Sequence, residues 1–121
     1  MRRCGVRKRV LIVDDYAPFR TAARELLEDA GYVVAGEAAD AAGALAAVRA
    51  NAPDVVLLDV QLPDEDGFAV AAALTAGRGT AVVLTSSRDA DEYGRRVEAC
   101  GARGFIPKSR LSAAAFAALV G

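Results

Sequence analysis

Histidine is absent from the 121 residues of this chain. Its absence excludes imidazole metal sites, Ser-His-Asp triads and Cys-His nucleophile pairs, because each of these needs an imidazole ring. Cysteine is scarce: Cys4 and Cys100 are the two present, and they form no CxxC pair. This usage indicates a reducing compartment.

Long apolar runs and a strong net charge are lacking as well. No stretch reaches transmembrane length, and no N-terminal apolar segment leads to a small-residue cleavage site. A net charge of −1 gives no global attraction to nucleic acid or to an anionic membrane. We therefore expect a cytoplasmic protein with neither nucleic acid nor a membrane among its partners.

The N-terminus is basic, yet it shows neither aromatic interleaving nor an amphipathic repeat. These features predict a solvated leader over residues 1–8, followed by one domain over residues 9–121. The basic residues concerned are Arg2, Arg3, Arg7, Lys8 and Arg9. With 54% hydrophobic and 26% charged residues, the rest of the chain has the composition of a globular domain.

Short, apolar, β-branched runs alternate along the chain with segments of helical periodicity. The runs predict buried strands at 10–13, 33–38, 55–58, 81–84 and 104–107. The segments between them predict helices at 18–30, 41–50, 68–76, 89–100 and 112–120. This alternation is typical of an α/β domain with a parallel sheet and helices on both faces, and the strand order 2-1-3-4-5 is the natural one.

Polar side chains stand where the strands of this sheet are expected to end. Asp14 and Asp15 follow the first strand, Asp59 the third, Thr85 the fourth and Lys108 the fifth. Parallel strands bring these positions to one rim, where ligands of such sheets bind. Crowded carboxylates repel one another, so the rim needs a cation or raised pKa values. Oxygen ligands with room for water favour Mg²⁺, with Mn²⁺ as the alternative, and a lysine and a hydroxyl nearby suit a phosphoryl group.

Plainer interpretations exist for single residues. Asp59 fits a turn after a strand, Asp14 a helix cap and Lys108 a solvated surface lysine. Phe105 is equally well explained as core packing. The joint placement of the polar residues at one rim favours a site.

In this order and context the chain resembles the receiver domain of two-component response regulators. The residues that carry the resemblance are Asp14-Asp15, the segment Asp59…Leu62-Pro63…Asp66-Gly67, Thr85 and Lys108. The resemblance extends from about Arg9 to Val120. The local sequences at 11–15 and 26–32 are most similar to those of receivers attached to helix-turn-helix output domains. It implies the flavodoxin-like receiver fold.

The resemblance also implies a phosphorylation switch. Asp59 would accept a phosphoryl group from a histidine kinase or phosphotransfer protein. Mg²⁺ would be held by Asp14, Asp15, Asp59 and the backbone carbonyl of Gln61. The chain would catalyse only its own phosphoryl transfer and autodephosphorylation.

The output implied by the resemblance passes through Thr85 and Phe105. Lys108 would pair with one phosphoryl oxygen, and the Thr85 hydroxyl would donate to another. Inward movement of Thr85 would leave space that Phe105 can enter, so that the face of the fourth helix, fifth strand and fifth helix repacks. That face would serve self-association or an output protein.

Three positions depart from the family pattern. Phe105 stands where a tyrosine is common, Ser86 stands where a smaller residue is common, and Ser109 replaces the proline that often follows the lysine. A Mg²⁺-dependent aspartyl-phosphate phosphatase is an alternative, but Tyr16 occupies the place of its second aspartate. The other alternative is an interaction module that keeps the pocket and does not cycle.

Overall fold

The computed structural model describes residues 8–77, 79–88 and 93–120. Its centre is a parallel sheet in the order β2-β1-β3-β4-β5, as predicted. The strands are β1 (Arg9–Val13), β2 (Val33–Ala38), β3 (Val55–Asp59), β4 (Ala81–Ser86) and β5 (Gly104–Pro107). The sequences of β1, β3 and β4 are almost entirely apolar because helices cover both faces of these strands.

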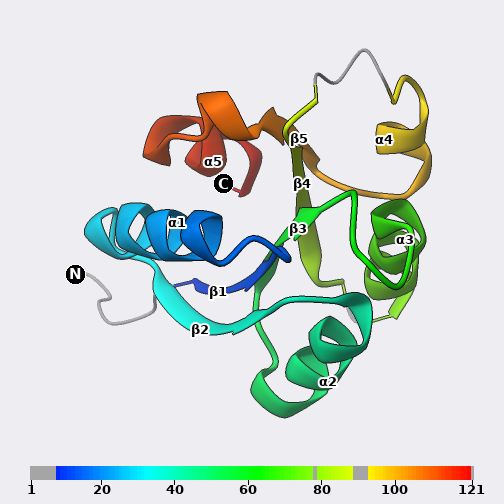
Figure 1. The fold of residues 1–121 in the computed structure, drawn as a ribbon, viewed down its shortest axis with the longest axis horizontal. Helices are drawn as coiled ribbons and strands as arrows, with labels where there is room; N and C mark the ends of the chain where they lie inside the picture. Colours follow the sequence, from blue (N-terminus) through cyan, green and yellow to red (C-terminus); the bar gives the residue numbers. More distant parts are fainter. Residues whose placement is uncertain (1–7, 78, 89–92, 121) are drawn as a thin grey trace.

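Helices pack on both sides of the sheet. They are α1 (Ala17–Asp29), α2 (Ala41–Asn51), α3 (Gly67–Gly77), α4 (Arg96–Ala99), the 3₁₀ turn η2 (Lys108–Arg110) and α5 (Ala113–Val120). Figure 1 shows α1 and α5 on one face and α2 and α3 on the other. Two separate apolar cores follow from this arrangement, one between the sheet and α1 and α5, the other between the sheet and α2, α3 and α4.

Local sequence signals account for the helix ends. Pro18 lies in the first turn of α1, where its missing amide hydrogen costs nothing. Ser112 caps α5, as predicted, by accepting a hydrogen bond from the Ala115 amide at 3.0 Å.

The helix predicted over 89–100 is confirmed only at Arg96–Ala99 and is wrong for the other described residues of that segment. Residues 93–95 form a turn, and α4 comprises only Arg96–Ala99. Gly94 explains the difference, because its φ of +54° is left-handed and cannot continue a right-handed helix. Residues 89–92 lie outside the described residues, and so does the expected basic leader except for Lys8.

No helix among the described residues is both long and apolar enough to cross a membrane. The topology places β1 and β3 side by side at the centre of the sheet, with α1 and α2 on opposite faces. The carboxyl ends of β1, β3, β4 and β5 therefore form one rim, and the polar residues singled out above lie along it.

Candidate functional site

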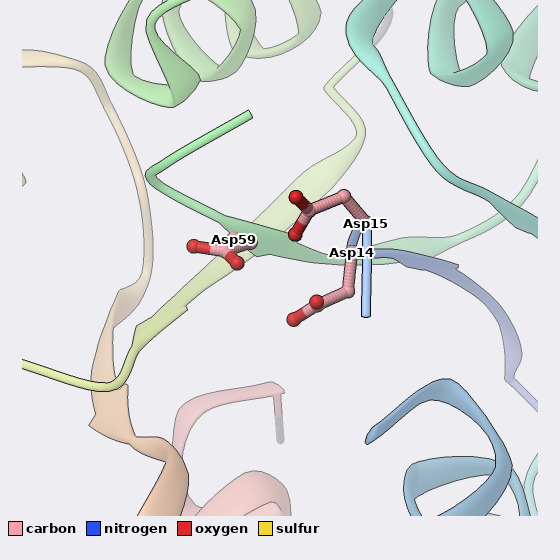
Figure 2. A group of neighbouring side chains, drawn as sticks. All are labelled: Asp14, Asp15 and Asp59. Carbon is pink, nitrogen blue, oxygen red and sulfur yellow. The ribbon is translucent and has the colours of Figure 1, made fainter. Parts of the chain in front are cut away.

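Three carboxylates meet where β1 and β3 end. Asp14, Asp15 and Asp59 each offer an oxygen within 4.8 Å of the others. Figure 2 shows Asp14 and Asp15 at the end of β1, beside Asp59 at the end of β3. Asp14 is 0% exposed and Asp59 4%, whereas Asp15 is open to solvent. The predicted acidic cluster therefore forms, with two of its members buried.

The position of Asp59 is held by its own loop and by the next helix. Its Oδ1 accepts a hydrogen bond from the Gln61 amide at 2.8 Å, and its backbone pairs with Thr85 of β4. Gly67 at the start of α3 packs directly behind it: a Cβ there would lie 2.5 Å from the Asp59 carbonyl oxygen. Only a residue without a side chain allows α3 to begin so close to this strand.

Asp14 is fixed from three directions. Its amide donates to the Ala38 carbonyl of β2 at 3.0 Å, and its Oδ1 accepts from the Tyr16 amide at 2.9 Å. Arg20 of α1 donates to its backbone carbonyl at 2.6 Å. The acidic turn is therefore anchored to both β2 and α1 before any ligand binds.

Lys108 closes the site from the side of β5. Its Nζ lies 2.7 Å from Asp14 Oδ2 and 3.2 Å from Asp59 Oδ2. It is a paired, half-buried cation rather than a solvated surface lysine.

No peptide bond in the described ranges is cis, and the chain turns after Pro107 through η2.

Burial and charge perturb both partners of this pair. Burial raises the pKa of Asp59, and the Asp14 charge adds to that effect against the opposing Gln61 amide and Lys108 ammonium. For Lys108, burial works against the charged form, but the bond to Asp14 and the charge of Asp59 outweigh it and raise its pKa. The lysine is therefore a permanent cation in this site at neutral pH.

Thr85 lies beside the acidic cluster with an unused hydroxyl. It is 0% exposed, it pairs with Asp59 across the sheet, and its Oγ1 has no hydrogen-bond partner among the described residues. A buried hydroxyl without a partner costs stability, and this one is free to bond to a ligand atom that enters the site.

Phe105 lies one residue further from the rim, paired with Leu84 of β4. Its ring packs at a tilt of 47° against Tyr93, with 5.5 Å between ring centres, and Tyr93 in turn contacts Phe68. The Tyr93 hydroxyl forms a 3.0 Å hydrogen bond with the Ser86 hydroxyl, next to Thr85. Phe105 is thus a packed aromatic residue, and its role in a switch stays a prediction.

Gln61 follows Asp59 in the loop that leads to α3, where it pairs with Asp66 in an isolated bridge. Its amide serves Asp59, and the use of its carbonyl as a metal ligand stays a prediction.

Asp64 and Asp66 make contacts in this loop that the sequence did not predict. Asp64 accepts hydrogen bonds from the Ala41 and Ala42 amides and so joins the Asp59 loop to α2. Asp66 accepts from the Phe68 amide at the start of α3 and forms an ion pair with Arg96 of α4. These contacts join segments far apart in the chain, so spacing could not reveal them. Asp64 and Asp66 are exposed, yet they join the Asp59 loop to α2 and to α4.

The donor set fits a hard divalent cation. All of its side-chain ligands are carboxylate oxygens, two of them are buried without enough cations to neutralise them, and the third, Asp15, leaves the site open to water. Mg²⁺ prefers such a site, with few carboxylates and several retained waters.

The family model for the response regulator receiver domain matches residues 10–119. The transcriptional regulatory protein PdtaR of Mycobacterium tuberculosis is 31% identical over 104 residues, which cover 86% of this chain and 51% of PdtaR. A protein-glutamate methylesterase/protein-glutamine glutaminase of Anaeromyxobacter dehalogenans is 48% identical over 91 residues, 73% of this chain and 26% of that protein. This chain thus spans about half or less of the length of these two relatives.

Among solved structures, the signal receiver domain of NarL from Mycobacterium tuberculosis superposes with a TM-score of 0.84 at 35% identity. The match covers 97% of this chain and 99% of that domain. The similarity therefore takes in the whole described fold, including every strand that contributes to the rim.

Proposed function

This chain belongs to the response regulator receiver domain family, and from that premise we propose that it is a two-component signalling switch phosphorylated on Asp59. The observation that carries the proposal is the meeting of Asp14, Asp15 and Asp59 with Lys108 at the end of the central strands. Asp14 is also buried and paired with Lys108, but Asp59 ends the middle strand β3, where its backbone pairs with Thr85 and places it between Asp14 and the free Thr85 hydroxyl.

In the proposed reaction, an Asp59 oxygen attacks the phosphorus of a phosphohistidine, and the phosphorus–nitrogen bond of the donor breaks. The donor is a histidine kinase or phosphotransfer protein, because this chain has no histidine of its own. Asp14, Asp15 and Asp59, with the Gln61 carbonyl, would hold Mg²⁺. When bound, the cation offsets the negative charge of the carboxylates and of the incoming phosphoryl group.

Lys108 and Thr85 act on the phosphoryl oxygens. The Lys108 ammonium already touches Asp59 Oδ2 and exchanges this contact for one with a phosphoryl oxygen. The buried Thr85 hydroxyl gains the acceptor that it lacks. Movement of Thr85 toward the phosphoryl group opens space for Phe105 and repacks the face of α4, β5 and α5, where an output protein or a second copy would bind.

The chain acts on no other substrate in this proposal and catalyses only its own phosphorylation and dephosphorylation. A Mg²⁺-dependent phosphatase is disfavoured because the second position after Asp14 holds Tyr16, whose side chain is 61% exposed.

The test is phosphorylation with acetyl phosphate and Mg²⁺, followed by mapping of the acid-labile phosphate. Label is expected on Asp59 alone, and it should disappear in Asp59→Asn and on chelation of the metal. Asp29→Asn, at the exposed end of α1, is the matched control and should label normally. Stable phosphate on serine or threonine would refute the assignment, and no label with an intact fold would favour the non-cycling module.

A further inference from the structure

Phe19 of α1 lies beside the side chain of Lys108, which follows β5. The Lys108 Nζ is 4.6 Å from the centre of the Phe19 ring. A cation this close to the face of an aromatic ring is attracted by the negative potential of that face. The ammonium therefore has carboxylates on one side and an aromatic face on another.

We propose that Phe19 is a positioning residue for Lys108, with its ring serving as the one contact of the ammonium that phosphorylation leaves in place. This inference rests on the proposed function. In the proposed reaction Asp14 and Asp59 both bind the cation, and Asp59 also becomes bonded to the phosphoryl group. The contacts of Lys108 with these carboxylates must therefore change during the reaction. The ring offers no oxygen to a cation or to phosphorus, and its contact with the ammonium is independent of both.

The position of Lys108 in the chain explains why its ammonium needs a contact that holds it in place. β5 ends at Pro107, and Lys108 opens a turn of only three residues. Its four-carbon stem is flexible, and holding it in one conformation costs rotamer entropy. A ring that keeps the ammonium near the rim lowers that cost at the moment when the carboxylate contacts are exchanged.

Core packing does not by itself demand an aromatic residue at position 19. The fully buried residues of α1 are Ala23 and Leu27, whereas Phe19 is half-buried at the edge of that core. Its backbone is fixed at the first turn of α1, one residue after Pro18. The ring is thus held in place by the helix while part of its surface remains available to the lysine.

Ring fluorination at position 19 tests the electrostatic part of this contact at nearly constant shape. The phenylalanine at position 19, and no other, is replaced by its mono-, di- and trifluoro analogues. Each added fluorine makes the electrostatic potential on the ring face less negative. The initial rate of phosphorylation by acetyl phosphate with Mg²⁺ should fall with each fluorine, by roughly threefold to tenfold over the series. Phe19→Leu should slow phosphorylation at least as much as the trifluoro analogue does. Phe19→Trp, which keeps an aromatic face, should be phosphorylated at the rate of the unmodified protein.

The same fluorinated series at Phe116 is the matched control. Phe116 is fully buried in the same core, contacts Tyr32 edge-on and has no part in the proposed site. Its series should leave the rate unchanged. A second readout needs no reaction: in the metal-free protein, the ε-methylene protons of Lys108 should show an upfield ring-current shift that Phe19→Leu abolishes.

Equal phosphorylation rates across the position-19 series would overturn the proposal, as would equal losses at positions 19 and 116. An absent ring-current shift would also overturn it. If the unmodified protein takes no phosphate on Asp59, the proposed function fails, and the Lys108 shift then decides alone whether the ring contact exists.

Discussion

At the scale of single residues, the site depends on one position where a side chain is excluded. A Cβ on Gly67 would lie 2.5 Å from both the Asp59 carbonyl oxygen and the Val60 Cα, atoms of the backbone that carries the proposed phosphoacceptor. These atoms cannot move without shifting the strand end. Gly67 therefore sets the distance between α3 and the site.

We predict that Gly67→Ala lowers the free energy of unfolding by about 1–3 kcal/mol, the usual cost of overpacking, and slows phosphorylation of Asp59. Gly77→Ala is the control, because a Cβ at that exposed end of α3 meets nothing within 4 Å. Urea denaturation and acetyl phosphate labelling measure the two effects. Equal free energies of unfolding for the two variants would contradict this prediction, because they would show that the backbone at Asp59 and Val60 shifts to accommodate the added Cβ at little cost.

A second residue-level prediction concerns Glu37 on β2, which bridges two arginines of α1. Its Oε2 lies 2.7 Å from Arg24 Nε and its Oε1 3.1 Å from Arg20 Nε, and Arg20 also holds the Asp14 carbonyl. The hydrogen bond from Arg24 is the main cause that lowers the pKa of Glu37 below its ordinary value of 4.5. The Glu37 pKa is thus lower in the folded protein than in the unfolded chain.

The sign of the pH dependence follows from that difference. Glu37 stabilises the fold at pH values above 4.5, and this contribution is lost as the pH falls through its lower folded pKa. We predict that Arg24→Gln raises the Glu37 pKa, seen by ¹³C NMR of its carboxyl, and costs up to about 1 kcal/mol at pH 7, since the pair is partly exposed. The difference from the unmodified protein should shrink below pH 4.5. Arg49→Gln, on the exposed side of α2, should leave the Glu37 titration unchanged.

The residues that could be predicted from sequence are those placed by strand ends. Asp14, Asp15, Asp59 and Lys108 each follow a short apolar run, so the parallel sheet brings them together without further information. Phe19 could not be assigned to the site in this way, because helical spacing marks it only as one more apolar residue of α1.

At the scale of elements, the loop after β3 joins α2 to the strand end that carries Asp59, the proposed phosphoacceptor. Asp64 accepts hydrogen bonds from the Ala41 amide at 2.8 Å and the Ala42 amide at 3.2 Å, while Asp40 caps the same helix through the Gly43 amide. The Ala41 amide is the main cause that lowers the pKa of Asp64. The start of α2 is therefore capped in part by a residue of another element.

We predict that Asp64→Ala lowers the free energy of unfolding, as loss of a helix cap does. Amide hydrogen exchange at Ala41 and Ala42 should accelerate. Glu65→Ala is the control, because Glu65 contacts only the Asp66 amide of its own loop among the hydrogen bonds described, and its effect should stay within about 0.5 kcal/mol. Unchanged exchange in Asp64→Ala would mean that Asp40 alone caps the helix.

The elements themselves were predictable wherever local signals agreed. Buried runs, Pro18 and Ser112 all marked the right boundaries to within a few residues. α4 was overestimated because its apolar spacing was taken as continuous, although Gly94 lies within it. Spacing counts the residues that face the core, but it does not report the backbone conformation between them, and here Gly94 is left-handed.

At the scale of the whole molecule, α4 is held from both sides of the proposed switch. Arg96 pairs with Asp66 of the β3–α3 loop and stacks over Phe68, with 4.3 Å from its guanidinium carbon to the ring centre. Tyr93, just before α4, bonds to Ser86 of β4 and packs on Phe105 of β5. Two sets of contacts therefore join the region of α4 to the site, one through the Asp59 loop and one through Ser86, next to Thr85.

We predict that beryllofluoride, a phosphoryl mimic, shifts backbone amide resonances chiefly between Thr85 and Phe116 when added with Mg²⁺. The reason is that Thr85 gains its missing acceptor and β4 moves with it, so the contacts of Tyr93 and Phe105 must readjust. By contrast, α1 and α2 pack on β1 and β2, which contain neither Thr85 nor Phe105. Two-dimensional ¹H–¹⁵N NMR measures the shifts, and Thr85→Ala is the matched variant: it keeps the carboxylates and Lys108 but removes the hydroxyl, so its shifts should stay at the rim. Shifts confined to the rim in the unmodified protein, or spreading into α1 alone, would contradict the proposed face of α4, β5 and α5. Equal long-range shifts in the unmodified protein and in Thr85→Ala would show that the change is transmitted through Asp66 and Arg96 and does not depend on the Thr85 hydroxyl.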